Sequence, residues 1–240
     1  RQRSRVVGAL AQPLILWALV GAGLAGTFSV PGAQGLDYQE YFFPGILGMV
    51  VLFAAIFGTM SVIEDRHEGF LQAVLTGPGG SDALALGKIL GGSAVAVLQG
   101  LALALLAPIA GFDLGAIDWP MLVLHLSLLA ASLTALGVVG AWLLDSVAGY
   151  HAVMMVVLFP LWMVSGAMFP PATVGPVLGL IMRLNPLTYA GEGLRRALYG
   201  GVLPQGALGI GGGPLVEVLV PAGFAVLAAG AAVLACRRRP

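Results

Sequence analysis

Six long apolar segments limit what this chain of 240 residues can fold into. They cover residues 7–30, 41–63, 89–112, 121–144, 152–169 and 218–236. None of them contains Asp, Glu, Lys or Arg, and a helix that crosses a bilayer needs about 20 apolar residues. The sequence therefore predicts an all-α membrane protein with six transmembrane helices.

The composition indicates that lipid covers most of the surface. Hydrophobic residues make up 59% of the chain and charged residues only 9%, whereas a soluble domain has about 25% charged residues. Because charge is so sparse, we expect membrane lipid to be the main solvent of the protein. The formal net charge is zero, which gives no electrostatic attraction to nucleic acid, and no nucleic-acid partner is expected.

The basic residues predict the orientation. Eight of the 11 Lys and Arg residues lie before the first segment, between the second and third, or after the last. With an even number of spans these places share one side of the membrane, and cytoplasmic loops carry the excess of Lys and Arg. We therefore expect both termini in the cytoplasm. Aromatic residues near the opposite boundary predict a belt at the outer membrane interface: Tyr38, Tyr41, Phe42, Phe43, Phe112 and Trp119.

The connection between the second and third spans, residues 64–88, is the most informative polar stretch. It opens with five charged or titratable residues, Glu64, Asp65, Arg66, His67 and Glu68. Apolar residues at helical spacing follow, namely Phe70, Leu71, Val74 and Leu75, until Gly77-Pro78 ends the pattern. One interpretation is a solvated loop with an interfacial helix. The other is a coupling helix, through which a moving cytoplasmic partner would displace both adjoining spans. A metal site at Asp65, His67 and Glu68 is disfavoured, because adjacent positions such as His67 and Glu68 do not share one helix face.

A second unusual stretch, residues 170–200, precedes the last span. Its apolar part, residues 174–184, is too short to cross a membrane and ends at Asn185-Pro186. A helical pattern then places Glu192 near Arg195 and Arg196, at spacings where helix side chains meet. One interpretation is a solvent-facing helix with a surface ion pair. The other is an outer re-entrant element, in which two half-helices form a gate with Asn185-Pro186 at the bend.

Four motifs in these two stretches resemble those of one transporter family. They are Glu64-Asp65-Arg66-His67-Glu68-Gly69, Leu75-Thr76-Gly77-Pro78, Gly87-Lys88-Ile89-Leu90-Gly91-Gly92, and Asn185-Pro186-Leu187-Thr188-Tyr189 with Glu192, Leu194 and Arg195 behind it. Together they resemble the type-2 ATP-binding-cassette (ABC) permeases, which include drug, polysaccharide and lipid-linked exporters. The order of elements is also similar: two spans, a coupling segment, three spans, an outer re-entrant element and a final span. The resemblance covers nearly the whole chain and implies one transmembrane domain, residues 1–240.

The resemblance implies a subunit that works with a separate ATPase in the bacterial cytoplasmic membrane. It assigns ATPase coupling to Glu64, Asp65, Arg66, His67, Glu68, Phe70 and Leu71, and an outer gate to Asn185, Pro186, Tyr189, Glu192 and Arg195. A second permease copy or a sibling would complete the transporter. ATP and Mg would bind the partner ATPase, because Gly87-Lys88 has Asp82 and Ile89 where a nucleotide-binding loop needs Gly and Ser or Thr. No catalytic, cofactor or metal residue is expected on this chain.

The interior of the bundle bears on substrate and alternatives. His125 lies inside the fourth span, where it is either a neutral histidine bonded to a neighbouring helix or a functional group. Met and Trp side chains on the fifth span offer either packing or an adaptable surface for a hydrophobic or amphiphilic substrate, such as a drug-like molecule, a lipid or a lipid-linked glycan. An ion-coupled carrier would need buried charges. A membrane enzyme or scaffold is the third class, and an enzyme needs titratable groups at one depth, which the sequence does not indicate.

Overall fold

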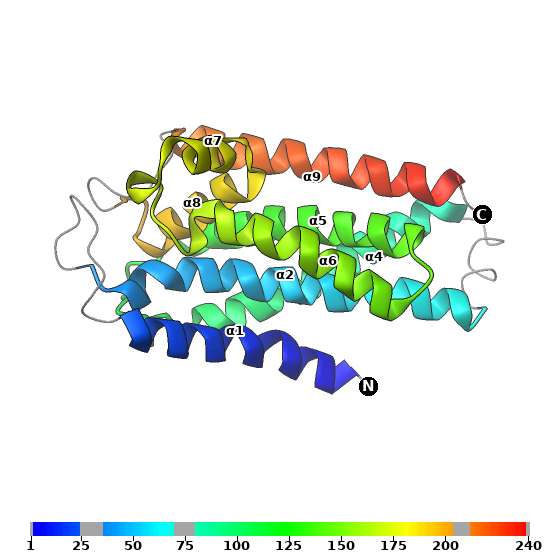
Figure 1. Cartoon of the computed structure of the whole chain (residues 1–240), viewed down its shortest axis with the longest axis horizontal. Helices are drawn as coiled ribbons and strands as arrows, with labels where there is room; N and C mark the ends of the chain where they lie inside the picture. The colour runs from blue at the N-terminus through cyan, green and yellow to red at the C-terminus, as the bar shows by residue number, and fades with distance from the viewer. Residues whose placement is uncertain (1, 25–35, 70–79, 204–211, 239–240) are drawn as a thin grey trace.

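The computed structural model is a bundle of helices and describes residues 2–24, 36–69, 80–203 and 212–238 (Figure 1). The long helices are α1 (Gln2–Leu24), α2 (Tyr38–His67), α4 (Gly80–Ala104), α5 (Trp119–Leu143), α6 (Val147–Trp162) and α9 (Gly213–Arg238). Within the described ranges, five helices are long and apolar enough to cross a membrane, and α1 carries a shorter apolar part, Ala11–Leu24. The predicted all-α membrane protein with about six helices is confirmed.

The helices do not follow the limits of the apolar segments. Helix α4 begins at Gly80 and stops at Ala104, because Pro108 lacks an N–H and its ring would clash with the carbonyl four residues earlier. A short 3-10 helix, η1 (Ala107–Ala110), follows. Hydrogen-bonded backbone also continues into polar sequence, so that Asp82 and Lys88 lie within α4 and Glu217 within α9. These charges, which the sequence places outside the spans, belong to the long helices.

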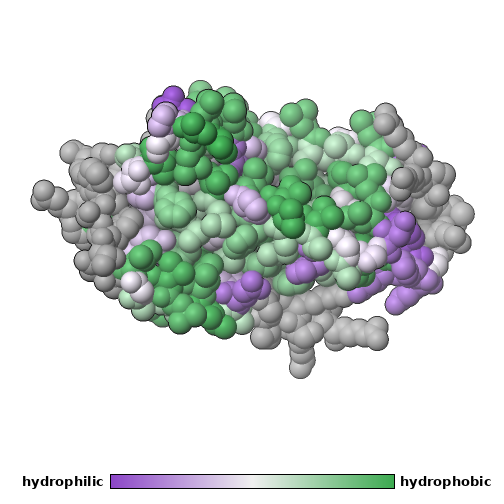
Figure 2. Space-filling model, in the orientation of Figure 1, coloured by the Kyte–Doolittle hydropathy of each residue, from purple (hydrophilic) through white to green (hydrophobic). Residues whose placement is uncertain are grey.

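Helices α2 and α5 form the centre of the bundle. In their most apolar stretches, 83% of the residues of α2 and 61% of those of α5 are buried, but only 17% of those of α9. The peripheral helices expose large apolar side chains, such as Leu90, Val156 and Leu227, as lipid-facing helices do. Figure 2 shows one face of the bundle as mainly apolar, with its largest hydrophilic patch at the end where α2 ends.

The predicted aromatic belt is wrong for α2. Tyr38, Tyr41, Phe42 and Phe43 are buried in the bundle, because α2 is the central helix and is covered on all sides. Trp17 of α1 packs edge-on against Phe43, with ring centroids 5.7 Å apart. These aromatic rings therefore join helices to one another instead of anchoring the protein at the membrane interface.

A break in the fifth span leads into two short helices. Helix α6 continues as a single π-helical turn, η2 (Met163–Ala167), in which Gly166 has a φ of +79°, a conformation that favours glycine. A 3-10 turn, η3 (Pro171–Thr173), precedes α7 (Pro176–Leu184) and α8 (Pro186–Leu198). Both short helices lie at the end of the bundle where α2 and α5 begin (Figure 1).

Candidate functional site at the two ends of the bundle

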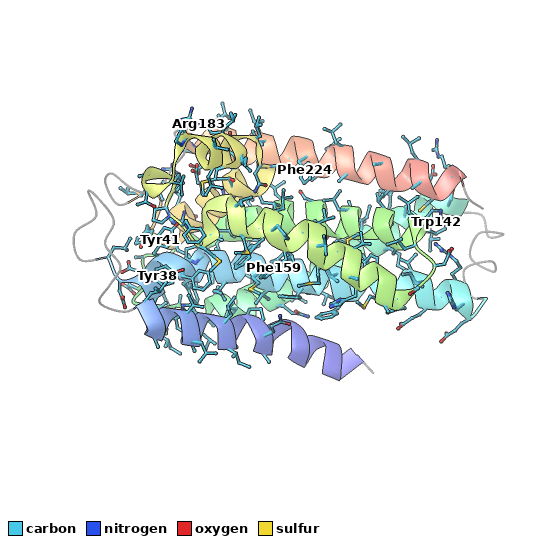
Figure 3. The ribbon with its side chains drawn as sticks, viewed as in Figure 1. Tyr38, Tyr41, Trp142, Phe159, Arg183 and Phe224 are labelled. Atoms are coloured by element: carbon cyan, nitrogen blue, oxygen red, sulfur yellow. The ribbon has the colours of Figure 1, made fainter. Side chains whose placement is uncertain are left out.

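We call the end where α2 stops at His67 and α4 begins at Gly80 the connector end, and the end that carries α7 and α8 the hairpin end. Figure 3 labels Trp142 at the connector end, and Tyr41 and Arg183 at the hairpin end. The residues predicted for ATPase coupling and for the gate thus lie at opposite ends of the bundle.

Ion pairs join neighbouring helices at the connector end. Lys88 of α4 approaches Asp65 of α2, with 2.5 Å between Nζ and Oδ2, and donates a second hydrogen bond to Ser61 at 3.0 Å. Arg237 of α9 forms a two-point ion pair with Asp82 of α4, and its Nε lies 2.7 Å from Oδ1. The basic residues in the last turn of α2, in the first part of α4 and at the end of α9 therefore share one end, as the charge pattern predicts.

Arg66 makes the densest set of contacts at this end. Its Nη1 donates to the Asp145 carboxylate at 3.0 Å, and its guanidinium lies 5.2 Å from the centroid of the Trp142 ring. The two Nη atoms also donate to three backbone carbonyls at 3.1–3.4 Å, those of Ala141, Trp142 and Leu144. The last carbonyls of a helix lack intrahelical partners, so Arg66 of α2 caps the end of α5.

The structure places five of the seven predicted coupling residues. Asp65 binds Lys88, Arg66 binds the end of α5, and His67 Nε2 lies 2.8 Å from the carbonyl oxygen of Asp145. Glu64 is half-buried and Glu68 is exposed. Phe70, Leu71 and the amphipathic helix expected around them lie outside the described residues. Among the residues described, no three His, Cys, Asp or Glu side chains are arranged to hold a metal ion.

Arg195 is buried at the hairpin end. The side chain is 3% exposed, and its Nη2 donates to the carbonyl of Gly166 at 3.2 Å. Tyr41 donates its hydroxyl to the same carbonyl at 2.5 Å, and the guanidinium lies 4.6 Å from the centre of the Tyr41 ring. The break at Gly166 exposes a carbonyl inside the bundle, and such a group needs a protein donor where water is absent.

The solvent-facing interpretation of α8 is therefore wrong. Glu192, one turn before Arg195, is only 2% exposed. Arg196 does not form a surface pair within α8 but binds Glu217 of α9 through two contacts of 2.6 and 2.8 Å. The polar side of α8 faces the bundle because the broken segment and α9 offer partners there. This hydrogen bond with Glu217 raises the pKa of Arg196 above its ordinary value.

Asn185 organises the turn between α7 and α8. Its Oδ1 accepts from the N–H of Leu187 at 3.0 Å, and its Nδ2 donates to the carbonyl of Leu161 at 2.7 Å. Pro186 occupies the first turn of α8, where its missing N–H costs nothing. Tyr189 reaches back to the carbonyl of Arg183 at 2.8 Å. The predicted pair of half-helices with a bend at Asn185-Pro186 is observed, and Asn185 also ties that bend to α6.

His125 has an environment that the sequence did not predict. It is fully buried in α5, and neither ring nitrogen has a hydrogen-bond partner among the described residues. One of the two interpretations, a hydrogen bond to a neighbouring helix, is not observed among the described residues. The residue of α8 next to the ring is Gly193, which has no side chain, and a Cβ atom there would overlap the imidazole. The imidazole is therefore held by packing alone.

A small cavity lies between α2, α5, η2 and α8. It measures about 20 Å³ and is lined by residues that include Gly48, Leu129, Trp162 and Arg195, which is room for about one water molecule. Trp162 is buried and donates its Nε1 to the carbonyl of Gly45 at 2.8 Å. This cavity is too small for an amphiphilic substrate, and Trp162 packs inside the chain.

The sequence did not identify Glu217, Tyr199 or Glu40 as parts of the hairpin end. Tyr199, which follows α8, donates to the Glu40 carboxylate of α2 at 2.8 Å, and burial raises the pKa of its hydroxyl. Glu217 pairs with Arg196 across 21 positions. Contacts at such distances in the chain leave no local pattern.

A bundle that has, within the described residues, five long apolar helices and large apolar side chains exposed on its periphery is the architecture of a multi-pass membrane protein. Residues 1–199 match the family model described as ABC-2 type transporter, and the chain therefore belongs to the ABC-2 type transporter family. It is also similar to the protein named "Putative transport permease ycf38" of Cyanophora paradoxa, with 27% identity over 200 residues, 81% of this chain and 68% of that protein. The family resemblance in the sequence is confirmed, and the chain is a membrane transport permease.

Proposed function

We propose that this chain is the transmembrane subunit of an ATP-driven exporter that moves a hydrophobic or amphiphilic substrate. The observation that carries the proposal is the connector end, where side-chain contacts tie the end of α2 to α4 and to the end of α5. A force applied to residues 64–88 would thereby reach most of the bundle. In a chain of the ABC-2 type family, the source of that force is a separate ATPase subunit.

The connector end faces the cytoplasm in this proposal. Exposed Glu68 and the following residues 70–76 would meet the ATPase. ATP and Mg bind that partner, and hydrolysis happens there. A second copy of this chain, or a sibling, completes the transporter, and the substrate passes between the two permeases, since the cavity between α2, α5, η2 and α8 holds about one water molecule. Drug-like molecules, lipids and lipid-linked glycans suit such an apolar route.

The hairpin end is the outer gate in this proposal. Helices α7 and α8 turn back at Asn185-Pro186, and Arg195 fastens α8 to the broken part of the fifth span. Glu192 and Tyr189 lie on the same short helix. When the ATPase subunits close, α8 would move away from this position and open the path outward.

An ion-coupled carrier is the second candidate function, because the chain contains buried charged residues. Glu192, Arg195 and Glu217 are all buried, although the sequence indicated none inside the spans. They gather at the hairpin end together with His125, and do not form a series across the membrane. A proton relay needs such a series, so the exporter is the better-supported function.

Reconstitution decides between the two candidates. The tagged chain would be purified from its native membrane with any ATPase that accompanies it, and placed in lipid vesicles with a fluorescent amphiphile. The exporter predicts transport that requires ATP and stops when the catalytic Glu of the ATPase is replaced. Transport by the permease alone, driven by a proton or sodium gradient, would establish the carrier instead.

A further inference from the structure

We propose that Arg66 is a positioning residue that passes movement of the connector into α5, and that α5 passes it to α8 through the contact of His125 with Gly193. The inference rests on the proposed function and gives it a route through the chain. It also changes the part assigned to Arg66, since this side chain contacts the end of α5 within the bundle.

The geometry of Arg66 suits the transmission of force. A guanidinium is a rigid planar fork with five donors, and here it binds the Asp145 carboxylate and three carbonyls at the end of α5 at once. Trp142 lies against one face of the fork. The C-terminal carbonyls of a helix carry partial negative charge, which adds to the attraction. A displacement of the end of α2 must therefore carry the end of α5 with it.

The hydrogen bonds of the other two ion pairs at this end reach side chains and not the backbone carbonyls of the partner helix. Lys88 offers Asp65 a compact ammonium on a flexible stem. The pair of Arg237 with Asp82 is exposed to solvent on both sides, where ion pairs contribute little. Arg66 binds several groups at the end of α5 at once. Among the described residues at the connector end, it therefore fixes both the direction and the position of its partner helix.

Helix α5 is built to carry the movement to the other end. It runs unbroken for 25 residues, with its Pro in the first turn, and so measures about 37 Å at 1.5 Å per residue. It packs against α2, α4, α6, α8 and α9. Because α5 contacts five other helices, it moves only if these neighbours adjust.

Two contacts show how closely α5 packs against α8 at the hairpin end. The imidazole of His125 fills the space left by Gly193, and the N–H of Asp118, the N-cap of α5, donates to the carbonyl of Ala197 at 2.9 Å. A shift of α5 therefore pushes directly on α8, the helix that carries Arg195.

The contact of His125 with Gly193 can exist in two states, one with α8 packed against α5 and one with the two helices separated. In the packed state, neither ring nitrogen has a partner among the described residues, and a buried polar group without a hydrogen bond is unfavourable. Separation of α8 from α5 would let water reach the ring. Hydration of the imidazole then offsets part of the lost packing, so a small displacement suffices to release α8.

The test uses the permease reconstituted with its ATPase. Val202, which is exposed just after α8, becomes Cys and carries an environment-sensitive fluorophore, in a background where the buried Cys236 is replaced by Ala. Arg66→Lys keeps the charge but loses the fork. We expect ATP hydrolysis to persist while transport and the ATP-dependent fluorescence change both fall about tenfold, a typical size for coupling between sites.

Three further variants complete the test. Arg183→Lys, a matched change at an exposed site, should leave hydrolysis, transport and fluorescence unchanged. Asp145→Asn removes the exposed carboxylate without disturbing the core, and should give a smaller loss in the same direction if Arg66→Lys does not fold. Gly193→Ala adds a Cβ atom that would overlap the imidazole of His125 and push α8 away from α5. Without ATP, the fluorophore at position 202 should then give the signal that the unmodified complex gives with ATP.

Each contrary result has a distinct meaning. Normal transport and fluorescence with Arg66→Lys and Asp145→Asn would overturn the proposal. Loss of ATPase binding with Arg66→Lys would also overturn it, because Arg66 would then contact the partner directly. Absence of ATP-dependent transport in the unmodified complex would instead refute the proposed function.

Discussion

Arg195 of α8 and Tyr41 of α2 donate hydrogen bonds to the same backbone carbonyl. The Arg195 guanidinium lies 4.6 Å from the Tyr41 ring centre, and both side chains donate to the oxygen of Gly166, at 3.2 and 2.5 Å. That oxygen is available because Gly166, with a φ of +79°, ends the π turn. Arg195 therefore supplies a donor to a backbone break within the bundle, and the same contact holds α8 in place.

Tyr41→Phe should test how much the hydrogen bond from Tyr41 to Gly166 contributes to stability. The substitution removes one hydrogen bond to Gly166 and keeps the ring under Arg195. We expect a loss of about 0.5–1.5 kcal/mol in the free energy of unfolding, which corresponds to about 1–6 °C in the midpoint of thermal unfolding for a chain of this size. Tyr189→Phe, which removes a hydrogen bond at a half-exposed site, is the control and should have a smaller effect. Equal shifts for the two variants would contradict the assignment.

Glu217→Gln should destabilise the attachment of α9 to α8. The amide can accept only part of the two-point contact that Arg196 makes at 2.6 and 2.8 Å, and it leaves the guanidinium without its counter-charge. Hydrogen bonds to charged groups contribute about 1.5–3 kcal/mol, so a loss of about 2 kcal/mol is expected.

The double variant Glu217→Gln with Arg196→Gln should recover part of that loss, because removal of both charges is less costly than removal of one. Thermal unfolding of the four proteins in detergent gives the coupling energy between the two residues. Additive losses in the double variant would show that the pair does not interact in the membrane protein as it does in the structure.

Local signals predicted the turn at Asn185-Pro186 and the spans themselves. A polar cap followed by Pro satisfies the local backbone at the start of a helix. About 20 apolar residues form a helix in lipid regardless of which side of the helix is buried in the protein. Both predictions depend on neighbours in sequence, and the structure agrees with both.

The faces of the helices could not be predicted in this way. A helix that is apolar all round has no periodicity to separate its lipid side from its buried side. The sequence therefore predicts an interfacial position for Tyr38 and Tyr41, whereas both side chains are buried among helices at the hairpin end. Partners far apart in the chain were missed for a related reason. Arg66 and Asp145 are 79 residues apart, and only the packing of α2 against α5 brings them together.

The triple variant Glu64→Gln, Glu68→Gln and Phe70→Ala should separate ATP hydrolysis from transport. Glu64 and Glu68 end α2 at half-buried and exposed positions, so their replacement should leave folding intact. The expected result is a complex that assembles but whose ATPase is no longer stimulated by substrate and whose transport is lost. A change at the hairpin end of the bundle, Asp113→Asn, is the control. Normal transport by the triple variant would show that the coupling residues are wrongly assigned.

Labelling of single cysteines should fix the orientation of the bundle. Glu68 directly follows α2 at the connector end, and Asp113 lies between η1 and the start of α5 at the hairpin end; both positions are exposed. In Glu68→Cys and Asp113→Cys, replacement of buried Cys236 by Ala removes the background labelling. Because basic residues gather at the connector end, a membrane-impermeant maleimide added to intact cells should label position 113 and not position 68, and both should react after the cells are opened. Labelling of position 68 in intact cells would invert the topology. The proposed ATPase contact would then face outward, where no ATP is available to drive it, so this one experiment also tests the exporter assignment.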